Sequence, residues 1–161
     1  MNHNPAAFLE KFKRPVAFAF FLLRHLPAAY FSGVRVVSAN ERQCVVKIPY
    51  KWFTRNPFRS TYFASLSMAA EMSTGVLALA QVYKRKPAVS MLVVRVESEY
   101  FKKATGKTFF TCNHGEAFRN AVDEAIATGE SRTVTAVSEG KNQDGETVAR
   151  FNITWSFRMK K

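Results

Sequence analysis

The sequence predicts an α+β domain in which a curved antiparallel sheet wraps around one long central helix. The segment from residue 60 to 83 has no proline and is apolar or small on nearly every side, as expected for a helix that is buried on most faces. Segments with alternating polar and apolar residues lie on both sides of it and predict strands with one buried face. Strands and helices do not alternate along the chain, so a doubly wound parallel sheet is not expected.

The chain before the first predicted strand has helical character. It extends from about residue 5 toward residue 30, with a break near Pro15 and an end at Pro27, because proline disrupts a helix that has already begun. We therefore predict two parts. Residues 1–31 form an N-terminal helical extension that packs on the domain, and residues 32–161 form the domain of sheet and central helix.

Asn56 and Pro57 form a suitable opening for the central helix, because asparagine caps exposed amides and proline suits the first helical position. The helix is expected over about residues 60–83, which would span roughly 36 Å. Basic residues at positions 84–86 then lie at its negative end, and Pro87 stops it.

Six segments with alternating side chains predict the strands. The last of them alternates most regularly, with Phe151, Ile153 and Trp155 on one face and polar residues on the other. A short helix is expected over residues 116–128 and a hairpin turn at residues 142–145. The predicted strands span residues 34–36, 44–48, 91–101, 107–113, 132–139 and 147–159.

The net charge of +12 suggests an anionic partner, which would be a nucleic acid, a membrane surface or a phosphate-bearing ligand. A solvated basic surface that aids solubility explains the charge equally well. No basic helix, zinc finger or RNP motif is present, so specific recognition of nucleic acid is not expected. The histidines lack metal-ligand spacing, so no metal is expected. Cys44 and Cys112 lie far apart in sequence and indicate reduced thiols in a cytoplasmic protein.

Residues 15–26 form an apolar run that is too short to span a bilayer, where about 20 residues are needed. The run also lacks a small-residue cleavage site, which argues against a signal peptide. With Lys11, Arg14 and Arg24 around it, the run suits either a helix packed on the domain or an interfacial helix that lies on a membrane.

Two motifs have the spacing of a known family. That family has Asn six residues before a His-Gly-Gly sequence and an acidic residue nine residues after its His; Asn56 and Glu71 occupy these positions when counted from Tyr62. The sequence Asp-Gly-Glu-Thr-Val-Ala at residues 144–149 matches the family's final hairpin. Over residues 33–158 the chain thus resembles the hot-dog-fold thioesterase superfamily. It is most similar to PaaI-like bacterial thioesterases of the phenylacetyl-CoA type and to uncharacterised thioesterase-like relatives.

The resemblance implies hydrolysis of an acyl-CoA thioester by a homodimer, or a dimer of dimers, with sites at the subunit boundary. No cofactor is implied beyond the coenzyme A of the substrate. The backbone amides of Phe63 and Ala64, next to Tyr62, would bind the substrate carbonyl and stabilise the oxyanion. Lysine and arginine side chains would hold the CoA phosphates. The candidates for the phosphates are Lys84, Arg85, Lys102 and Lys103.

The chain departs from the family where Tyr62, Phe63 and Ala64 replace His-Gly-Gly. In the family, the small residues let the thioester carbonyl approach the amides at the start of the helix, and the bulky Phe63 narrows this approach. The substitution leaves two alternatives to an enzyme. One is a non-catalytic module that binds acyl-CoA or lipid, and the other is a basic protein that binds membranes peripherally through residues 8–30.

Glu71 is the only acidic residue between positions 42 and 96, and it lies within the apolar helix. Burying an unpaired carboxylate costs free energy, so the group either raises its pKa or recruits a polar partner. Glu71 is therefore either a general base or nucleophile, or one half of an ion pair with a basic residue from another strand or subunit. Asn56 has two corresponding interpretations, the helix N-cap or a residue that orients water or the carbonyl.

Overall fold

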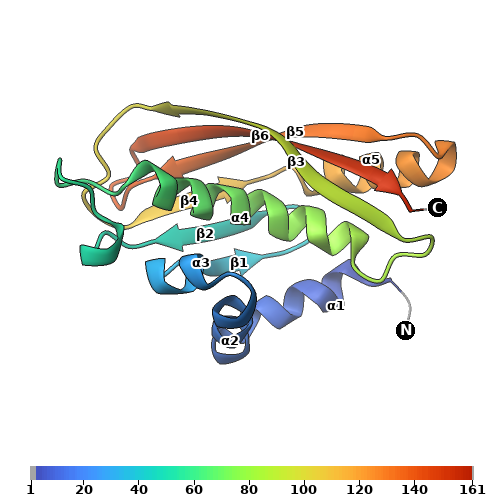
Figure 1. Ribbon diagram of the computed structural model, residues 1–161, viewed down its shortest axis with the longest axis horizontal. Helices are drawn as coiled ribbons and strands as arrows, with labels where there is room; N and C mark the ends of the chain where they lie inside the picture. The colour runs from blue at the N-terminus through green and yellow to red at the C-terminus, as the bar shows by residue number, and fades with distance from the viewer. Residues whose placement is uncertain (1–2, 161) are drawn as a thin grey trace.

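Six strands form one sheet in the order β1-β2-β4-β5-β6-β3 in the computed structural model, which describes residues 3–160 (Figure 1). Every neighbouring pair is antiparallel, as the alternating sequence predicts. The strand order places β1 and β3 at the two edges. The strands are β1 (Arg35–Ala39), β2 (Cys44–Ile48), β3 (Val89–Tyr100), β4 (Thr108–Cys112), β5 (Arg132–Lys141) and β6 (Thr147–Met159).

The long helix α4 lies against one face of this sheet (Figure 1). The shorter helix α5 packs against β5 and β6. Among the described residues, α4 is the one helix long and apolar enough to cross a membrane, but 61% of that window is buried inside the domain, as expected for a core helix. The helices are α1 (Pro5–Glu10), η1 (Lys11–Lys13), α2 (Pro15–His25), α3 (Pro27–Ser32), η2 (Trp52–Thr54), α4 (Phe63–Val82) and α5 (Gly115–Thr128).

The N-terminal segment differs from its prediction at Pro27. This proline does not end the helical region but is the first residue of α3. The first N–H groups of a helix have no hydrogen-bond acceptor within the helix, so a proline at this position loses no hydrogen bond. The residue before it, Leu26, has φ −138° and ψ 62°, which ends α2, since a residue before proline avoids the helical conformation. The segment is therefore three short α-helices, and Gly33 ends the last of them with a left-handed φ of 77°.

The rotation of α4 about its own axis is fixed by polar contacts inside the core. Ser73 Oγ lies 2.7 Å from Ser138 Oγ of β5, and Trp155 Nε1 of β6 donates to Thr74 Oγ1 at 2.9 Å. The side of α4 that is turned away from Ser138 is only partly buried. The partly exposed stripe there consists of Ala64, Ser67, Met68, Glu71, Gly75 and Leu79.

Candidate active site

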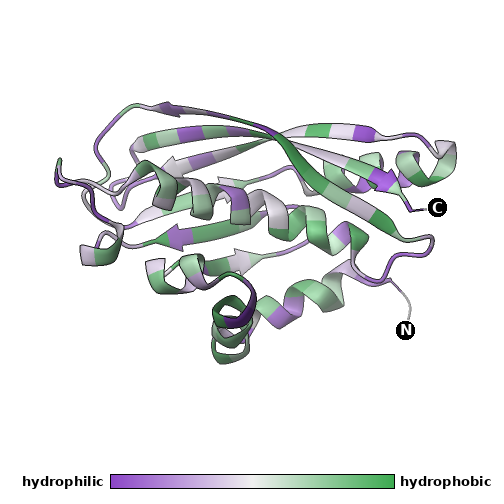
Figure 2. Ribbon diagram, viewed as in Figure 1, coloured by the Kyte–Doolittle hydropathy of each residue, from purple (hydrophilic) through white to green (hydrophobic). Residues whose placement is uncertain are grey.

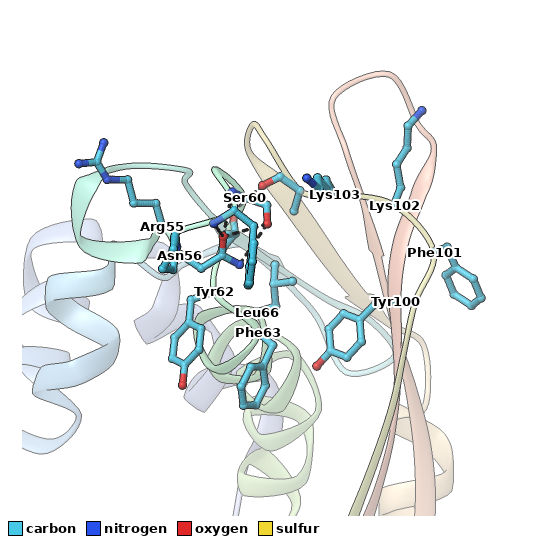
Figure 3. A pocket seen from close by; sticks show the side chains of 14 residues that line it. Arg55, Asn56, Ser60, Tyr62, Phe63, Leu66, Tyr100, Phe101, Lys102 and Lys103 are labelled. Carbon is cyan, nitrogen blue, oxygen red and sulfur yellow. Dashed lines mark hydrogen bonds between the residues drawn. The ribbon is translucent and has the colours of Figure 1, made fainter.

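A hollow of about 830 Å³ opens at the N-terminal end of α4 (Figure 3). Its walls come from the loop before the helix, the first turn of α4, and the chain that follows β3. Aromatic rings and basic side chains meet here. The lining residues are Arg55, Asn56, Pro57, Phe58, Ser60, Thr61, Tyr62, Phe63, Leu66, Tyr100, Phe101, Lys102, Lys103 and Ala104.

Asn56 shapes the loop of this hollow and does not cap α4, so the N-cap interpretation is wrong. Its Oδ1 accepts hydrogen bonds from the backbone N–H of Phe58 and of Ser60 at 3.0 and 3.2 Å, and its Nδ2 lies 3.1 Å from Ser60 Oγ. The helix begins only at Phe63, with Tyr62 as an N-cap residue whose side chain makes no capping bond. Asparagine satisfies amides in a tight loop as readily as in a cap, and sequence spacing does not separate the two.

The first turn of α4 borders the hollow through Phe63 and Leu66, and its first backbone amides are free within the described chain. None of the hydrogen bonds found among residues 3–160 has the N–H of Phe63 or Ala64 as its donor, as expected for the first residues of a helix. The Phe63 side chain is 56% exposed, and in Figure 3 it extends, with Tyr62, away from the Asn56 loop. Free N–H groups at the positive end of the helix dipole favour an anion or a developing oxyanion.

Two of the four predicted phosphate-binding cations lie at this hollow. Lys102 forms an ion pair with Glu146 at 2.6 Å, whereas Lys103 forms no ion pair within the described chain. Arg55, which the sequence analysis did not single out, is a third cation in the wall and likewise has no ion-pair partner among the described residues. Its position directly before Asn56 was the signal that could have identified it.

The other two predicted cations, Lys84 and Arg85, follow the last turn of α4. A helix of 20 residues spans about 30 Å, so in one chain they lie far from the hollow at Phe63. Arg85 forms an ion pair with Asp123 of α5. Within a single chain, the structure therefore brings Lys102 and Lys103 to the candidate site and leaves the other two at the opposite end of the helix.

Glu71 belongs to the partly exposed stripe of α4, on the side that α2 covers. It borders an apolar hollow of about 150 Å³ whose walls include Phe18 and Leu22 of α2 and Trp155 of β6. Burial there raises the pKa of its carboxyl. Among residues 3–160, its side chain has no hydrogen bond and no ion pair. The ion pair that the sequence left as an alternative is therefore not formed within this part of the chain.

Gly75, one turn further along α4, makes room for this carboxylate. A Cβ atom at Gly75 would lie 3.1 Å from Glu71 Oε1 and 3.3 Å from the Trp155 ring, so a larger residue would crowd both groups. A second hollow of about 220 Å³ on the other side of Glu71 is lined by His25 of α2. Sequence reasoning did not identify His25, because its link to Glu71 exists only once α2 folds onto α4.

Phe63 and Glu71 are eight residues apart in α4, which corresponds to about 12 Å along the axis. The helix-start amides and the carboxylate therefore lie in different hollows of one chain, the first beside the loop at Asn56 and the second beneath α2. No single thioester carbonyl reaches both groups within one protomer.

Glu71→Gln is expected to stabilise the fold at neutral pH. The unfolded chain ionises this carboxyl near the ordinary pKa of about 4.3, whereas the folded chain keeps the proton to higher pH, so stability falls as pH rises between the two pKa values. Glutamine removes this loss. In urea denaturation, the variant should be as stable as the wild type below about pH 4 and more stable at pH 7. The same pH dependence in both proteins would contradict a desolvated Glu71.

The two cysteines are the other candidate nucleophiles, and their burial argues against this role. Cys44 and Cys112 face each other across β2 and β4 as free, buried thiols, and Cys112 Sγ lies 3.9 Å from His114 Nδ1. Burial raises the pKa of the Cys112 thiol to about 11 and that of Cys44 further still. A thiol with such a pKa supplies almost no thiolate at neutral pH.

Solved structures with this architecture come from several bacteria. The chain matches a protein of unknown function from Pseudomonas aeruginosa, named a probable thioesterase, with TM-score 0.77 and 20% identity over 91% of this chain and 97% of that one. It matches the PaaI protein of the Escherichia coli phenylacetic acid degradation operon with TM-score 0.64 and 14% identity over 96% of each chain. A thioesterase from Haemophilus influenzae matches with TM-score 0.61 and 12% identity over 85% of this chain and 86% of that one.

These similarities and the six-stranded antiparallel sheet around α4 define the class of the protein as a hot-dog fold, which confirms the fold expected from the sequence. No curated protein sequence matches the chain. A family described as a domain of unknown function, DUF4442, matches residues 17–157. The chain therefore belongs to the DUF4442 family, and the family match includes most of α2.

Proposed function

We propose that this protein hydrolyses a thioester, with an acyl-CoA as substrate and Glu71 as the general base. One observation carries the proposal. A carboxylate without a partner in the described chain lies in an apolar hollow on the central helix, with its pKa raised by burial. A base of this kind is poised nearer to neutral pH than an exposed glutamate. The thioesterase names of the similar structures support the same reaction class.

In the proposed reaction, Glu71 takes a proton from a water molecule as the water oxygen attacks the thioester carbonyl carbon. The carbonyl oxygen becomes an oxyanion, which the free amides of Phe63 and Ala64 and the helix dipole stabilise. The C–S bond then breaks, and the leaving thiolate takes up the proton. The products are a carboxylic acid and free coenzyme A.

The amides at the start of α4 and the Glu71 carboxylate are too far apart in one chain to act on the same thioester, so the proposed site requires a second copy of the chain. Strand β3 is an edge of the sheet with one side unpaired, and Leu92, Val94 and Val96 on it are exposed. Exposed apolar edge strands tend to pair with another chain. We propose a two-fold dimer through β3, in which the α4 helices of the two protomers run in opposite directions. The start of one α4 then lies toward the middle of the other, where Glu71 is located.

The double substitution Leu92→Lys and Val96→Lys is expected to dissociate this dimer. Leu92 is 65% exposed in one chain and Val96 is exposed as well, so lysine leaves the core of the protomer intact while it disfavours edge pairing. Light scattering at micromolar concentration should show a dimer for the wild type and a monomer for the variant.

Val37→Lys is the matched control, because Val37 is an exposed apolar residue on the opposite edge strand, β1. It should remain a dimer. A monomeric wild type would contradict the proposed site, since one protomer holds only half of it. Dissociation by Val37→Lys alone would place the subunit contact at β1 instead.

The proposed activity is tested with a panel of short, aromatic and long acyl-CoAs, read by release of the free thiol. Hydrolysis of at least one class is expected. Absence of hydrolysis across the panel, together with saturable binding of acyl-CoA, would favour the second candidate, a non-catalytic acyl-binding protein. The specific observation behind that candidate is the bulky Phe63 in place of glycine at the start of α4.

A further inference from the structure

Helix α2 exposes most of its apolar residues to solvent. Only Phe18 and Leu22 of this helix are buried, and the remaining large side chains point outward. Figure 2 shows hydrophobic residues over most of α2. The outer apolar residues, which we call the α2 face, are Val16, Phe20 and Leu23, with Phe21 and the C-cap residue Leu26 at the edges of this face. A helix that served only to cover the core would carry polar residues at these positions.

Basic residues flank α2 in the sequence. Lys11 and Arg14 precede the helix, and Arg24 lies in its last turn. Residues 1–70 contain ten lysines and arginines and two acidic residues, a net charge of +8 out of the +12 of the whole chain. One of those two, Glu41, forms an ion pair with Arg119 of α5 and so does not neutralise this region. Large apolar side chains flanked by cations are the pattern of a helix that lies in the interface of an anionic membrane.

A groove beside α2 has the shape and chemistry for a lipid chain. It measures about 640 Å³, lies between α1, α2 and the end of α4, and is lined by Phe12, Phe18 and Phe21 among other apolar residues, with Lys11 and Arg14 also in its wall. The apolar lining suits hydrocarbon, and the two cations suit an anionic headgroup.

A bilayer surface fits these features better than a second copy of the chain. Two α2 faces packed on each other would bring Arg14 and Arg24 of both copies together, while α2 itself contains no acidic residue, and like charges at an interface disfavour association. A spanning role is excluded by length, because the 11 residues of α2 extend about 16 Å and a bilayer core measures about 30 Å.

We propose that α2 anchors the protein to the surface of a bilayer that contains anionic phospholipids, with the α2 face inserted among the acyl chains and Lys11, Arg14 and Arg24 at the headgroups. This proposal does not depend on thioester hydrolysis, and its test has no hydrolytic readout. The β3 edge proposed for dimerisation is a separate surface.

The full chain is tested by co-flotation with vesicles of phosphatidylcholine and phosphatidylglycerol in equal amounts, and with vesicles of phosphatidylcholine alone. The protein is expected to bind the mixed vesicles, and to bind vesicles of phosphatidylcholine alone at least tenfold more weakly. Binding to the mixed vesicles should fall as salt is added. The double substitution Phe20→Ser and Leu23→Ser should weaken binding to the mixed vesicles at least tenfold, because two large apolar side chains no longer insert. Phe20 is 68% exposed, so the fold should survive the change.

Phe58→Ser is the matched control, since Phe58 is 73% exposed but lies in the hollow at the start of α4. It should bind vesicles like the wild type. Unchanged binding by the α2 variant, or an equal loss with Phe58→Ser, would overturn the proposal. Equal binding to both vesicle types would overturn the anionic requirement. A fall in particle mass of the α2 variant without lipid would show that the α2 face joins copies of the chain instead.

Discussion

Glu71→Gln is expected to lower the rate of thioester hydrolysis by about 10²–10⁴-fold while the fold is retained. Glutamine keeps the shape of the side chain but cannot take a proton from water. In the described chain Glu71 has no ion-pair partner that the substitution would leave unpaired, so folding should not suffer. The loss should appear in kcat, because the base acts in the chemical step and is not needed to hold the substrate.

The pH profile provides a second readout of the same role. Because burial raises the pKa of Glu71, the wild-type rate should rise with pH through an apparent pKa above that of a free glutamate, about 4.3. His25 is a second ionisable side chain in the wall of the neighbouring hollow, so His25→Gln is needed to show which group sets the profile. An apparent pKa that remains in His25→Gln and disappears with Glu71→Gln would assign it to the carboxyl.

Glu116→Gln is the control for the loss of one carboxylate. Glu116 is exposed in the first turn of α5 and does not belong to the partly exposed stripe of α4. It should hydrolyse at the wild-type rate. Full activity in Glu71→Gln would mean that Glu71 is a structural carboxylate and that the base lies elsewhere.

The fold was predictable because its periodic signals are long and local. The alternation from Phe151 to Trp155 continues through most of β6, and the apolar segment without proline contains all of α4. Both patterns reflect which face of an element is buried, which a sequence records directly. Helix boundaries were less predictable. Asn56 and Pro27 carry genuine cap and break signals, but such signals occur equally in tight loops and at helix starts.

The candidate site was predictable only in part, because its residues meet through tertiary packing. Asn56, Phe63 and Lys103 line one hollow, but only the first two are close in sequence. Glu71 lies in another, and the cover over it comes from α2, which no spacing within the central helix reveals. Arg85 is occupied by Asp123, a partner from a different helix. Sequence patterns identify which residues carry charge but not which of them find partners.

The cover over Glu71 links the N-terminal helices to the proposed chemistry. Phe18 and Leu22 of α2 are the buried residues of that helix, and both line the hollow that raises the pKa of the carboxyl. The same helix carries the exposed α2 face on its other side. A membrane contact that shifts α2 would therefore change the solvation of Glu71, and with it the pKa of the base.

Reversing the charges of Arg55 and Lys103, two cations in the hollow at the start of α4, is expected to raise KM for CoA thioesters. Arg55 and Lys103 have no ion-pair partners among the described residues, and both line the hollow at the start of α4. A hydrogen bond to a charged group contributes about 1.5–3 kcal/mol, and solvent screening reduces this at an exposed site. Arg55→Glu with Lys103→Glu should therefore raise KM for an acyl-CoA about tenfold to a hundredfold, with a smaller effect on kcat.

The matched control is Arg158→Glu with Lys160→Glu, which makes the same change in net charge on exposed residues at the end of β6. It should leave KM close to the wild-type value. Added salt should raise KM for the wild type and lower KM for the Arg55 and Lys103 variant, because salt screens an attraction to the phosphates in the first protein and a repulsion in the second. A length-matched thioester without the nucleotide should be hydrolysed equally by wild type and variant. Equal losses with both pairs of substitutions would mean that the phosphates respond to the overall charge of the protein and not to this hollow.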